Sequence, residues 1–251
     1  MPELPDVEGF RREARKAAGR RIERVEAVDA TLLRGGRAAV VEGERFGDPV
    51  RHGKWLIFPA GGAEVLMHFG MTGRLDWAPR RSERHRHDRI VFVCRGGELR
   101  YRNMRKFGGI WISRQGRERI TGPLGPDATE VDGERFGELL AGRRGTVKHT
   151  LMDQTVIAGL GNLMVDETAW RARIDPRRRL SELSPRRIDR LWEAMDGVVR
   201  DSLPTGRVPP VESWLTGARD ARDARCPRCG TRLRRATVAG RTTVWCPREQ
   251  R

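Results

Sequence analysis

The sequence predicts an α+β protein with an N-terminal β-sandwich and a flanking helix, a helical middle region and a C-terminal β-hairpin. Three observations support this prediction. A helical pattern opens the chain, short apolar runs separated by glycine fill residues 20–113, and helical periodicity resumes near residue 134 before a cysteine-rich end. Many short strands with turn signals between them are typical of a sandwich or a barrel.

The first expected element is an amphipathic helix over residues 4–18. Pro5 suits its first turn, and Asp6 and Glu8 complement the positive end of the helix dipole. Its apolar face is formed by residues three and four apart, namely Val7, Phe10, Ala14 and Ala17.

Short extended runs follow this helix. We interpret Cys94, which follows one of them, as a small buried hydrophobe. The clearest predicted strands are 54–58, 64–68, 89–93 and 109–112.

The second half of the chain changes character after a stretch at 114–134 that is rich in Gly, Pro and charge, the expected linker. Ser184 and Pro185 mark the start of the longest helix. The predicted helices are 134–142, 146–153, 162–172 and 184–203. A loop at 204–225 and a hairpin at 226–247, which turns at Ala239-Gly240, follow them. We expect domains at 1–120, 130–205 and 222–251.

The composition indicates a polyanionic partner. The net charge is +16 and the pI is about 11.2. Only four of the 50 basic residues are lysines, and lysine is the one that readily loses its proton. Acidic residues near the start and the lack of a long apolar run argue against an export signal or a membrane span. We therefore expect a cytosolic location with access to DNA.

Three of the four cysteines, Cys226, Cys229 and Cys246, lie in two short knuckles joined by the hairpin. Their spacing is typical of a zinc ribbon, but Glu249 stands where a fourth thiolate is expected. Zinc accepts carboxylate oxygen, although structural ribbons mostly use sulfur. Two alternatives stay open: bound zinc with Glu249 as candidate fourth ligand, or a metal-free hairpin. In either case Arg241, at the hairpin tip, is suited to contact a phosphate, or it is one more solvated arginine.

The opening residues Met1-Pro2-Glu3-Leu4-Pro5-Asp6 carry a candidate catalytic group. Removal of the initiator methionine would leave Pro2 with a secondary amine, and α-amino groups titrate near ~8. Such an amine attacks carbonyl carbons to form a Schiff base, and the carboxylate of Glu3 can move the protons. The alternative is that Pro2 merely precedes a helix.

The segment Gly159–Glu167 combines a glycine-rich double turn with a new helix that we expect Asn162 to cap. Free backbone N–H groups at a helix start form a natural phosphate site. The alternative is a tight turn between packed helices.

Six segments in this order resemble the formamidopyrimidine-DNA glycosylase/endonuclease VIII family over the whole chain. They are Pro2-Glu3-Leu4-Pro5, Gly53-Lys54, His68-Phe69-Gly70-Met71-Thr72-Gly73, Arg105-Lys106-Phe107-Gly108, Gly159–Glu167 and the cysteine hairpin with Gly240-Arg241-Thr242-Thr243. The resemblance implies a helix–two-turn–helix domain in the middle and a zinc ribbon at the end.

The resemblance also implies a base-excision repair enzyme, a bifunctional DNA glycosylase and AP lyase that flips a damaged nucleotide out of the duplex. Pro2 would then attack C1′ of the sugar, and Glu3 would transfer protons. Elimination at the 3′ and 5′ phosphates would cut the strand, with Lys54 near the scission point. The implied partner is damaged double-stranded DNA, bound by a monomer in the cytoplasm, at the nucleoid.

The remaining DNA contacts implied by the family fall into two groups. Met71, Arg105 and Phe107 match a wedge that replaces lost stacking and hydrogen-bonds the widowed base. The other group grips the backbone without reading sequence: His68, Asn162 and Arg241 match phosphate-binding residues, and Lys148 matches a lysine before the double turn.

Departures from the family pattern lie at Asp6, usually glutamate, at Glu249, and in the loop 204–225. This loop is much shorter than in enzymes that excise 8-oxoguanine, which favours formamidopyrimidines, oxidised pyrimidines or hydantoins as substrates. If Met1 is retained, the Pro2 nitrogen is an amide and cannot attack. The rival interpretations are a catalytically silent DNA-binding protein of the same fold and, less favoured, a ribbon-bearing RNA-binding factor.

Overall fold

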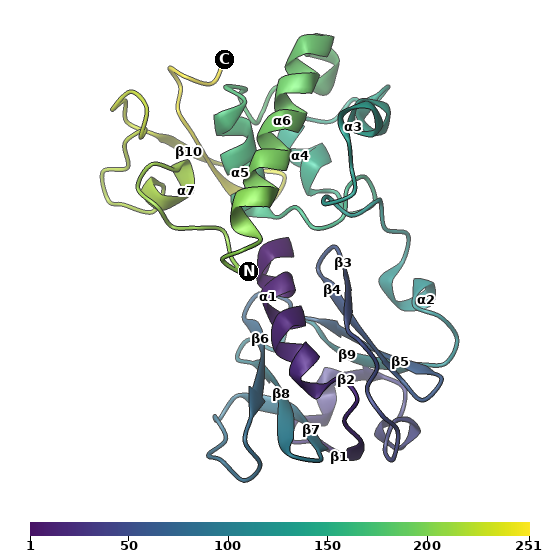
Figure 1. The fold of residues 1–251 in the computed structure, drawn as a ribbon. Helices are drawn as coiled ribbons and strands as arrows, with labels where there is room; N and C mark the ends of the chain where they lie inside the picture. The colour runs from purple at the N-terminus through teal and green to yellow at the C-terminus, as the bar shows by residue number, and fades with distance from the viewer. The chain divides into compact units, whose positions relative to one another are not determined.

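A computed structural model describes residues 1–251, and its contacts divide the chain into two compact units. The first unit comprises Met1, Pro2 and residues 6–123, and the second comprises Glu3–Pro5 and residues 124–251. Each unit is described separately, with element labels as in Figure 1. No helix of the chain combines the length and the apolar character that crossing a membrane requires.

The first unit is the predicted β-sandwich. Helix α1 (Leu4–Ala14) precedes it and continues as one turn of 3-10 helix, so it ends earlier than the periodicity predicted. One sheet has four antiparallel strands, β1 (Ile22–Ala27), β7 (Asp88–Cys94), β8 (Gly97–Asn103) and β6 (Gly73–Ala78), in that spatial order. The other has five, in the order β2 (Leu33–Gly35), β9 (Gly109–Ser113), β5 (Ala63–His68), β4 (Trp55–Ala60) and β3 (Val50–His52).

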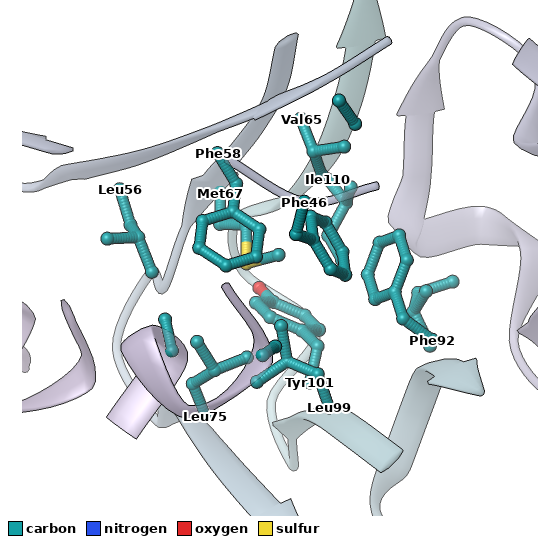
Figure 2. Close-up of a cluster of buried hydrophobic side chains, with 14 of the residues drawn as sticks. Phe46, Leu56, Phe58, Val65, Met67, Leu75, Phe92, Leu99, Tyr101 and Ile110 are labelled. Carbon is teal, nitrogen blue, oxygen red and sulfur yellow. The ribbon is translucent and has the colours of Figure 1, made fainter. Parts of the chain in front are cut away.

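The core of the sandwich takes side chains from both sheets (Figure 2). Phe46 packs its ring against Phe58 and Phe92, with centroid distances of 4.1 and 5.5 Å, and so joins strands of the two sheets. Each such fully buried apolar side chain stabilises the fold by about 1.5–3 kcal/mol. Cys94 is also fully buried, as expected, and burial raises the pKa of its thiol to about 12.

Strand β8 was not among the strands predicted from the sequence, because it has no apolar run: three charged side chains separate or flank its two large apolar ones. Leu99 and Tyr101 face the core, whereas Glu98 and Arg100 are buried as an ion pair at 2.8 Å. Burial of a charge is tolerated only when it is paired and hydrogen-bonded. A pattern based on hydrophobicity cannot anticipate that pairing, which involves residues outside the strand as well.

The second unit is helical and ends in the hairpin. Its apolar core is centred on residues such as Phe136, Met164 and Leu191, and a smaller core surrounds Trp170 and Val244. Its helices are α3 (Gly133–Leu140), α4 (Val147–Met152), α5 (Asn162–Arg171), α6 (Pro185–Ser202) and α7 (Leu215–Ala218), followed by strands β10 (Arg234–Val238) and β11 (Arg241–Trp245). The short helix α2 (Glu118–Thr121) belongs to the first unit.

The hairpin turns at the expected dipeptide. Ala239 and Gly240 both have positive φ, 50° and 69°, between the paired residues Val238 and Arg241. Two central residues with positive φ define the tight turn whose twist matches that of the flanking strands. Arg241 is therefore the first residue after the turn, and it is exposed.

Candidate functional site

Glu3 lies at the start of α5, although 160 residues separate the two in sequence. Its side chain is buried, and its carboxylate accepts the N–H groups of Leu163 at 2.8 Å and Met164 at 3.0 Å. The positive end of the helix dipole and two donors stabilise negative charge at this position. A Cβ at Gly161 would lie 2.2 Å from the Glu3 carboxyl carbon, so a larger residue there would displace the Glu3 carboxylate from the helix start.

This arrangement corrects two sequence expectations. The residue before α5 is Gly161, without a side-chain cap, and Asn162 is the first helical residue, so Asn162 does not cap the helix. The Asn162 amide instead donates to the carbonyl of Thr242 at 3.0 Å. Two of the N–H groups that we considered for a phosphate, those of Leu163 and Met164, are occupied by the Glu3 carboxylate from the N-terminus of the chain.

Lys148 is fully buried, with its ammonium 2.6 Å from Oδ1 of Asp166. Arg219, 3% exposed, donates to the other oxygen of Asp166 at 2.7 Å. Burial raises the pKa of the Asp166 carboxyl, which the two cations counteract, and burial lowers the pKa of Lys148. Lys148 thus stands in an internal ionic network, and its direct contact with DNA stays a prediction.

His68 and Lys54 are neighbours in the first unit. Lys54 follows Gly53 in the turn between β3 and β4, and His68 ends β5 opposite Trp55. Burial, and then the positive charge of Lys54, lower the pKa of His68 to about 4. The imidazole is therefore neutral at neutral pH, and its Nδ1 accepts the N–H of Gly70 at 3.3 Å.

Met71, Arg105 and Phe107 lie on two loops that one buried amide holds together. Asn103 donates to the carbonyl of Phe107 at 2.7 Å and accepts the Thr72 hydroxyl at 3.1 Å and the Lys106 N–H at 3.0 Å. The Thr72 hydroxyl in turn accepts the Arg105 N–H at 3.0 Å. The guanidinium of Arg105 stacks 5.2 Å from the Phe107 ring, which is 51% exposed.

The same two loops meet through glycine. A Cβ at Gly70, where φ is +58°, would lie 1.7 Å from the carbonyl oxygen of Phe107. At Gly108, with φ of +96°, a Cβ would meet the carbonyl oxygen of His68 at 2.2 Å. The glycines in the predicted motifs are therefore required for this close approach.

The three cysteines of the hairpin form a cluster whose sulfur atoms all lie within 4.8 Å of one another. Cys229 and Cys246 have their sulfurs 3.6 Å apart. Two sulfurs bound to one zinc at about 2.3 Å with tetrahedral geometry lie roughly 3.8 Å apart, so the donor set fits zinc. A hydrogen bond involving Thr231 lowers the pKa of Cys229, whereas burial raises that of Cys246 to about 11.

Glu249 lies outside this cluster of sulfurs. Its carboxylate is 3.7 Å from Nε of Arg173, and its backbone N–H points to the Cys246 sulfur at 3.5 Å. The identity of a fourth zinc ligand stays a prediction.

Of the other predicted residues, Pro2 is partly buried beside Met1, which is 41% exposed. Three residues of these networks were not predicted from the sequence: Asn103, Asp166 and Arg219. Asp166 lies within the segment Gly159–Glu167, among apolar residues. An acidic residue in such surroundings could have indicated a buried, paired carboxylate. Nothing distinguishes Arg219 from the other arginines before the chain folds.

Two features define an enzyme class that handles DNA: exposed cationic and apolar side chains held by buried networks, and a candidate amine nucleophile that precedes a buried carboxylate in the sequence. The formamidopyrimidine-DNA glycosylase N-terminal domain matches residues 1–110, and the helix–two-turn–helix (H2TH) domain of the same enzymes matches residues 124–208. A zinc finger found in FPG and IleRS matches residues 225–248. The chain belongs to the formamidopyrimidine-DNA glycosylase family, whose members act in base-excision repair.

Relatives named formamidopyrimidine-DNA glycosylase cover the whole chain. The Symbiobacterium thermophilum protein is 35% identical over 100% of this chain and 89% of its own length. The Geobacillus kaustophilus protein is 33% identical over 100% of both chains.

Solved structures agree. MutM in complex with DNA containing carbocyclic 8-oxo-G is similar at a TM-score of 0.90, with 29% identity over 99% of both chains. The Lactococcus lactis enzyme with Fapy-dG DNA gives 0.89 and 28% over the same share. These matches confirm the predicted family and fold. Together with the cysteine cluster, the zinc-finger match identifies a structural zinc site.

Proposed function

We propose that this chain is a bifunctional DNA glycosylase and AP lyase that excises oxidised bases from double-stranded DNA and cuts the strand. The family membership and the DNA-bound relatives support the glycosylase activity. The observation within the chain that carries the proposal is the buried Glu3 carboxylate, held on the start of α5 directly after Pro2.

The proposed chemistry begins at the secondary amine of Pro2 after Met1 has been removed. The amine attacks C1′, and the glycosidic bond breaks with its electron pair leaving on the base, which takes up a proton. The sugar ring opens to an iminium, and loss of a C2′ proton drives elimination of the 3′ phosphate, followed by the 5′ phosphate. Glu3 is the proposed carrier of these protons.

The proposed DNA contacts use both exposed and partly buried side chains, with one fully buried lysine behind them. His68, Asn162 and Arg241 would grip phosphates, Lys54 would contact the phosphate near the cut, and Lys148 would add positive charge from within. Met71, Arg105 and Phe107 would fill the space left by the extruded nucleotide, which suits an exposed aromatic ring and a stacked guanidinium.

Zinc, when bound, would hold the two knuckles together through Cys226, Cys229 and Cys246, with Glu249 the candidate fourth ligand. We also propose three functional segments, 1–120, 130–205 and 222–251. The family matches at 1–110, 124–208 and 225–248 support this division. Because its substrate would be chromosomal DNA, we propose that the protein acts in the cytoplasm, at the nucleoid.

The decisive experiment is borohydride reduction with a duplex that contains an abasic site. The processed protein should give a covalent adduct at Pro2, whereas protein with a blocked terminus should give none. Pro2→Gly, which still presents an amine, should retain part of the reaction. DNA binding without any adduct would favour the catalytically silent DNA-binding protein, and equal activity of blocked protein would contradict the mechanism.

A second experiment tests Glu3. Glu3→Gln should bind lesion DNA but cleave it about a hundredfold more slowly, the lower end of the range for loss of a general acid–base group. Because the glutamine NH₂ would face a helix N–H, a thermal melt must accompany the assay to separate a loss of stability from a loss of chemistry. A cleavage rate equal to wild type would remove Glu3 from the mechanism.

Substrate preference follows from the short loop 204–225. We propose formamidopyrimidines, oxidised pyrimidines or hydantoins in preference to 8-oxoguanine. Parallel single-turnover assays on duplexes that differ only in the lesion would rank them, and fastest excision of 8-oxoguanine would overturn this preference.

A further inference from the structure

We propose that Asp166 and Arg219 are positioning residues that fix strand β11 on helix α5 and thereby hold Arg241 where it can contact a DNA phosphate. This inference rests on the proposed function, because the phosphate contact of Arg241 is part of it. It adds two buried residues, one of them in the segment 204–225, to those that would support DNA binding.

Asp166 is the centre of the arrangement. It is fully buried on α5, and all the partners of its two oxygens come from other elements of the unit. Oδ1 accepts from Lys148 at 2.6 Å, while Oδ2 accepts from Arg219 at 2.7 Å and from the backbone N–H of Val244 at 3.1 Å. One carboxylate thus joins α4, α5, the loop and β11.

The carbonyl of Thr242 is the second anchoring point on β11. It accepts from Asn162 at 3.0 Å and from Lys148 and Arg219 at 3.3 Å each. The hairpin sheet has only two strands, so part of the β11 backbone lacks a strand partner. Side chains of the network satisfy Thr242 and Val244 instead, and this fixes the position of the residue beside them, Arg241.

The loop that supplies Arg219 is itself tied to α5. The N–H of Thr216 donates to Oε2 of Glu167 at 3.1 Å, so two consecutive acidic residues of α5 hold the same loop. Arg219 is 3% exposed, and its guanidinium cannot reach a phosphate without leaving its partners. Its effect on DNA is therefore indirect, and the exposed arginine next to the Thr242 that it holds is Arg241.

The salt dependence of DNA binding separates this role from a general loss of stability. Each phosphate contact contributes about 0.9 to the slope of log K against log salt. We suggest measuring fluorescence anisotropy of a duplex with a tetrahydrofuran abasic analogue over a KCl series. The proteins are wild type, Arg241→Ala, Arg219→Ala and the double variant, all loaded with zinc.

Arg241→Ala and Arg219→Ala should each reduce the slope by about 0.9 and weaken binding roughly fivefold at 0.15 M salt, the factor that this slope change gives relative to 1 M. The double variant should match Arg241→Ala alone, because a displaced arginine and a missing one lose the same contact. A wild-type slope for Arg219→Ala, or additive losses in the double variant, would overturn the inference.

Arg200→Ala is the matched control. Arg200 is an exposed arginine of α6 in the same unit, paired with Asp196 at 2.7 Å, and its removal should leave the slope unchanged. If Arg219→Ala does not fold, Arg219→Gln decides, since it keeps a donor for Thr242 without the ion pair. Its slope should lie between those of wild type and Arg241→Ala, and a wild-type slope would contradict the role.

The two proposals fail in different ways. If the wild-type protein does not bind the abasic duplex, the proposed function itself is wrong. If it binds while Arg219→Ala keeps the wild-type slope, the function stands and only the positioning role falls.

Discussion

In each unit a buried polar network holds the backbone beneath exposed side chains, those of Arg105 and Phe107 in the first unit and of Arg241 in the second. The two networks differ in charge. In the sandwich, the neutral amide of Asn103 joins the loops of Met71 and Phe107 through hydrogen bonds. In the helical unit, the carboxylate of Asp166 joins the hairpin to α5 through two cations. Neutral hydrogen bonds and buried ion pairs are thus two ways to fix the backbone beneath an exposed side chain.

The two ways carry different penalties when they are broken. A neutral hydrogen bond that is lost costs about the desolvation of the groups left unpaired, ~1–3 kcal/mol. A buried ion pair that loses one partner leaves an uncompensated charge in a medium of low dielectric constant, at ~3–5 kcal/mol. Removal of one partner should therefore destabilise the charged network more than the neutral one.

The largest effect is expected for Asp166→Ala, which leaves Lys148 and Arg219 buried without their counter-ion. The free energy of unfolding of the second unit should fall by about 3–5 kcal/mol, measured by urea denaturation. Asp189→Ala, on the exposed face of α6, should change it by less than ~0.5 kcal/mol. A loss below ~1 kcal/mol for Asp166→Ala would contradict the expected cost of leaving the two buried cations unpaired.

Asn103→Ala tests the neutral network. It leaves the Phe107 carbonyl and the Lys106 N–H without their partner, and we expect a loss of about 2–3 kcal/mol from the first unit. Thr72→Val, which removes a single hydroxyl of the same network, should cost less. If Asn103→Ala proved more damaging than Asp166→Ala, the ranking of the two networks would be reversed.

His68 adds a dependence on pH that is confined to the sandwich. The folded protein keeps the imidazole neutral down to about pH 4, whereas the unfolded chain takes up a proton near ~6.5. Unfolding therefore binds a proton in this window, and stability falls as the pH decreases from ~6.5 towards 4.

The size of this effect is roughly 1–2 kcal/mol after allowance for the partial exposure of His68. The stabilities of wild type and His68→Gln should converge on acidification, which urea titrations at pH 7.5 and pH 5 would detect. A constant difference between the two proteins would show that His68 does not titrate as described.

The smallest effect is expected at the hairpin turn. Ala239 has a φ of 50°, a conformation that costs a non-glycine residue about 1 kcal/mol. Ala239→Gly should raise stability by up to ~1 kcal/mol without altering the network beneath it, and a thermal melt would measure the gain. A decrease in stability would indicate that the Ala239 side chain makes a contact that the strained turn requires.

Local pattern was sufficient for much of the fold. Strands such as 64–68 and 109–112 and the helix at 162–172 were predicted to within one or two residues, because their periodicity or their β-branched composition reflects burial directly. The strand over Gly97–Asn103 was not, because its charged residues are stabilised by ion pairs, within the strand and with Arg84 and Asp88, that a hydrophobicity pattern does not reveal.

The candidate site divides in the same way. Residue type and spacing are enough to identify the cysteines, Arg241 and the two loops that carry Met71 and Phe107. They do not identify the cap of α5, because it comes from Glu3, 160 residues away. Nor do they identify the role of Arg219, one arginine among 46 until folding brings it to Asp166.

Residue order along the chain was thus enough to predict most elements, the family and the chemistry of single motifs, since these depend on neighbours two to four positions apart. Which charges become buried, and which distant backbone groups they satisfy, was decided only when the chain packed. The reason is physical: a buried charge is stable only when it is paired, and the partners of Glu3 and Asp166 lie far from them in the sequence.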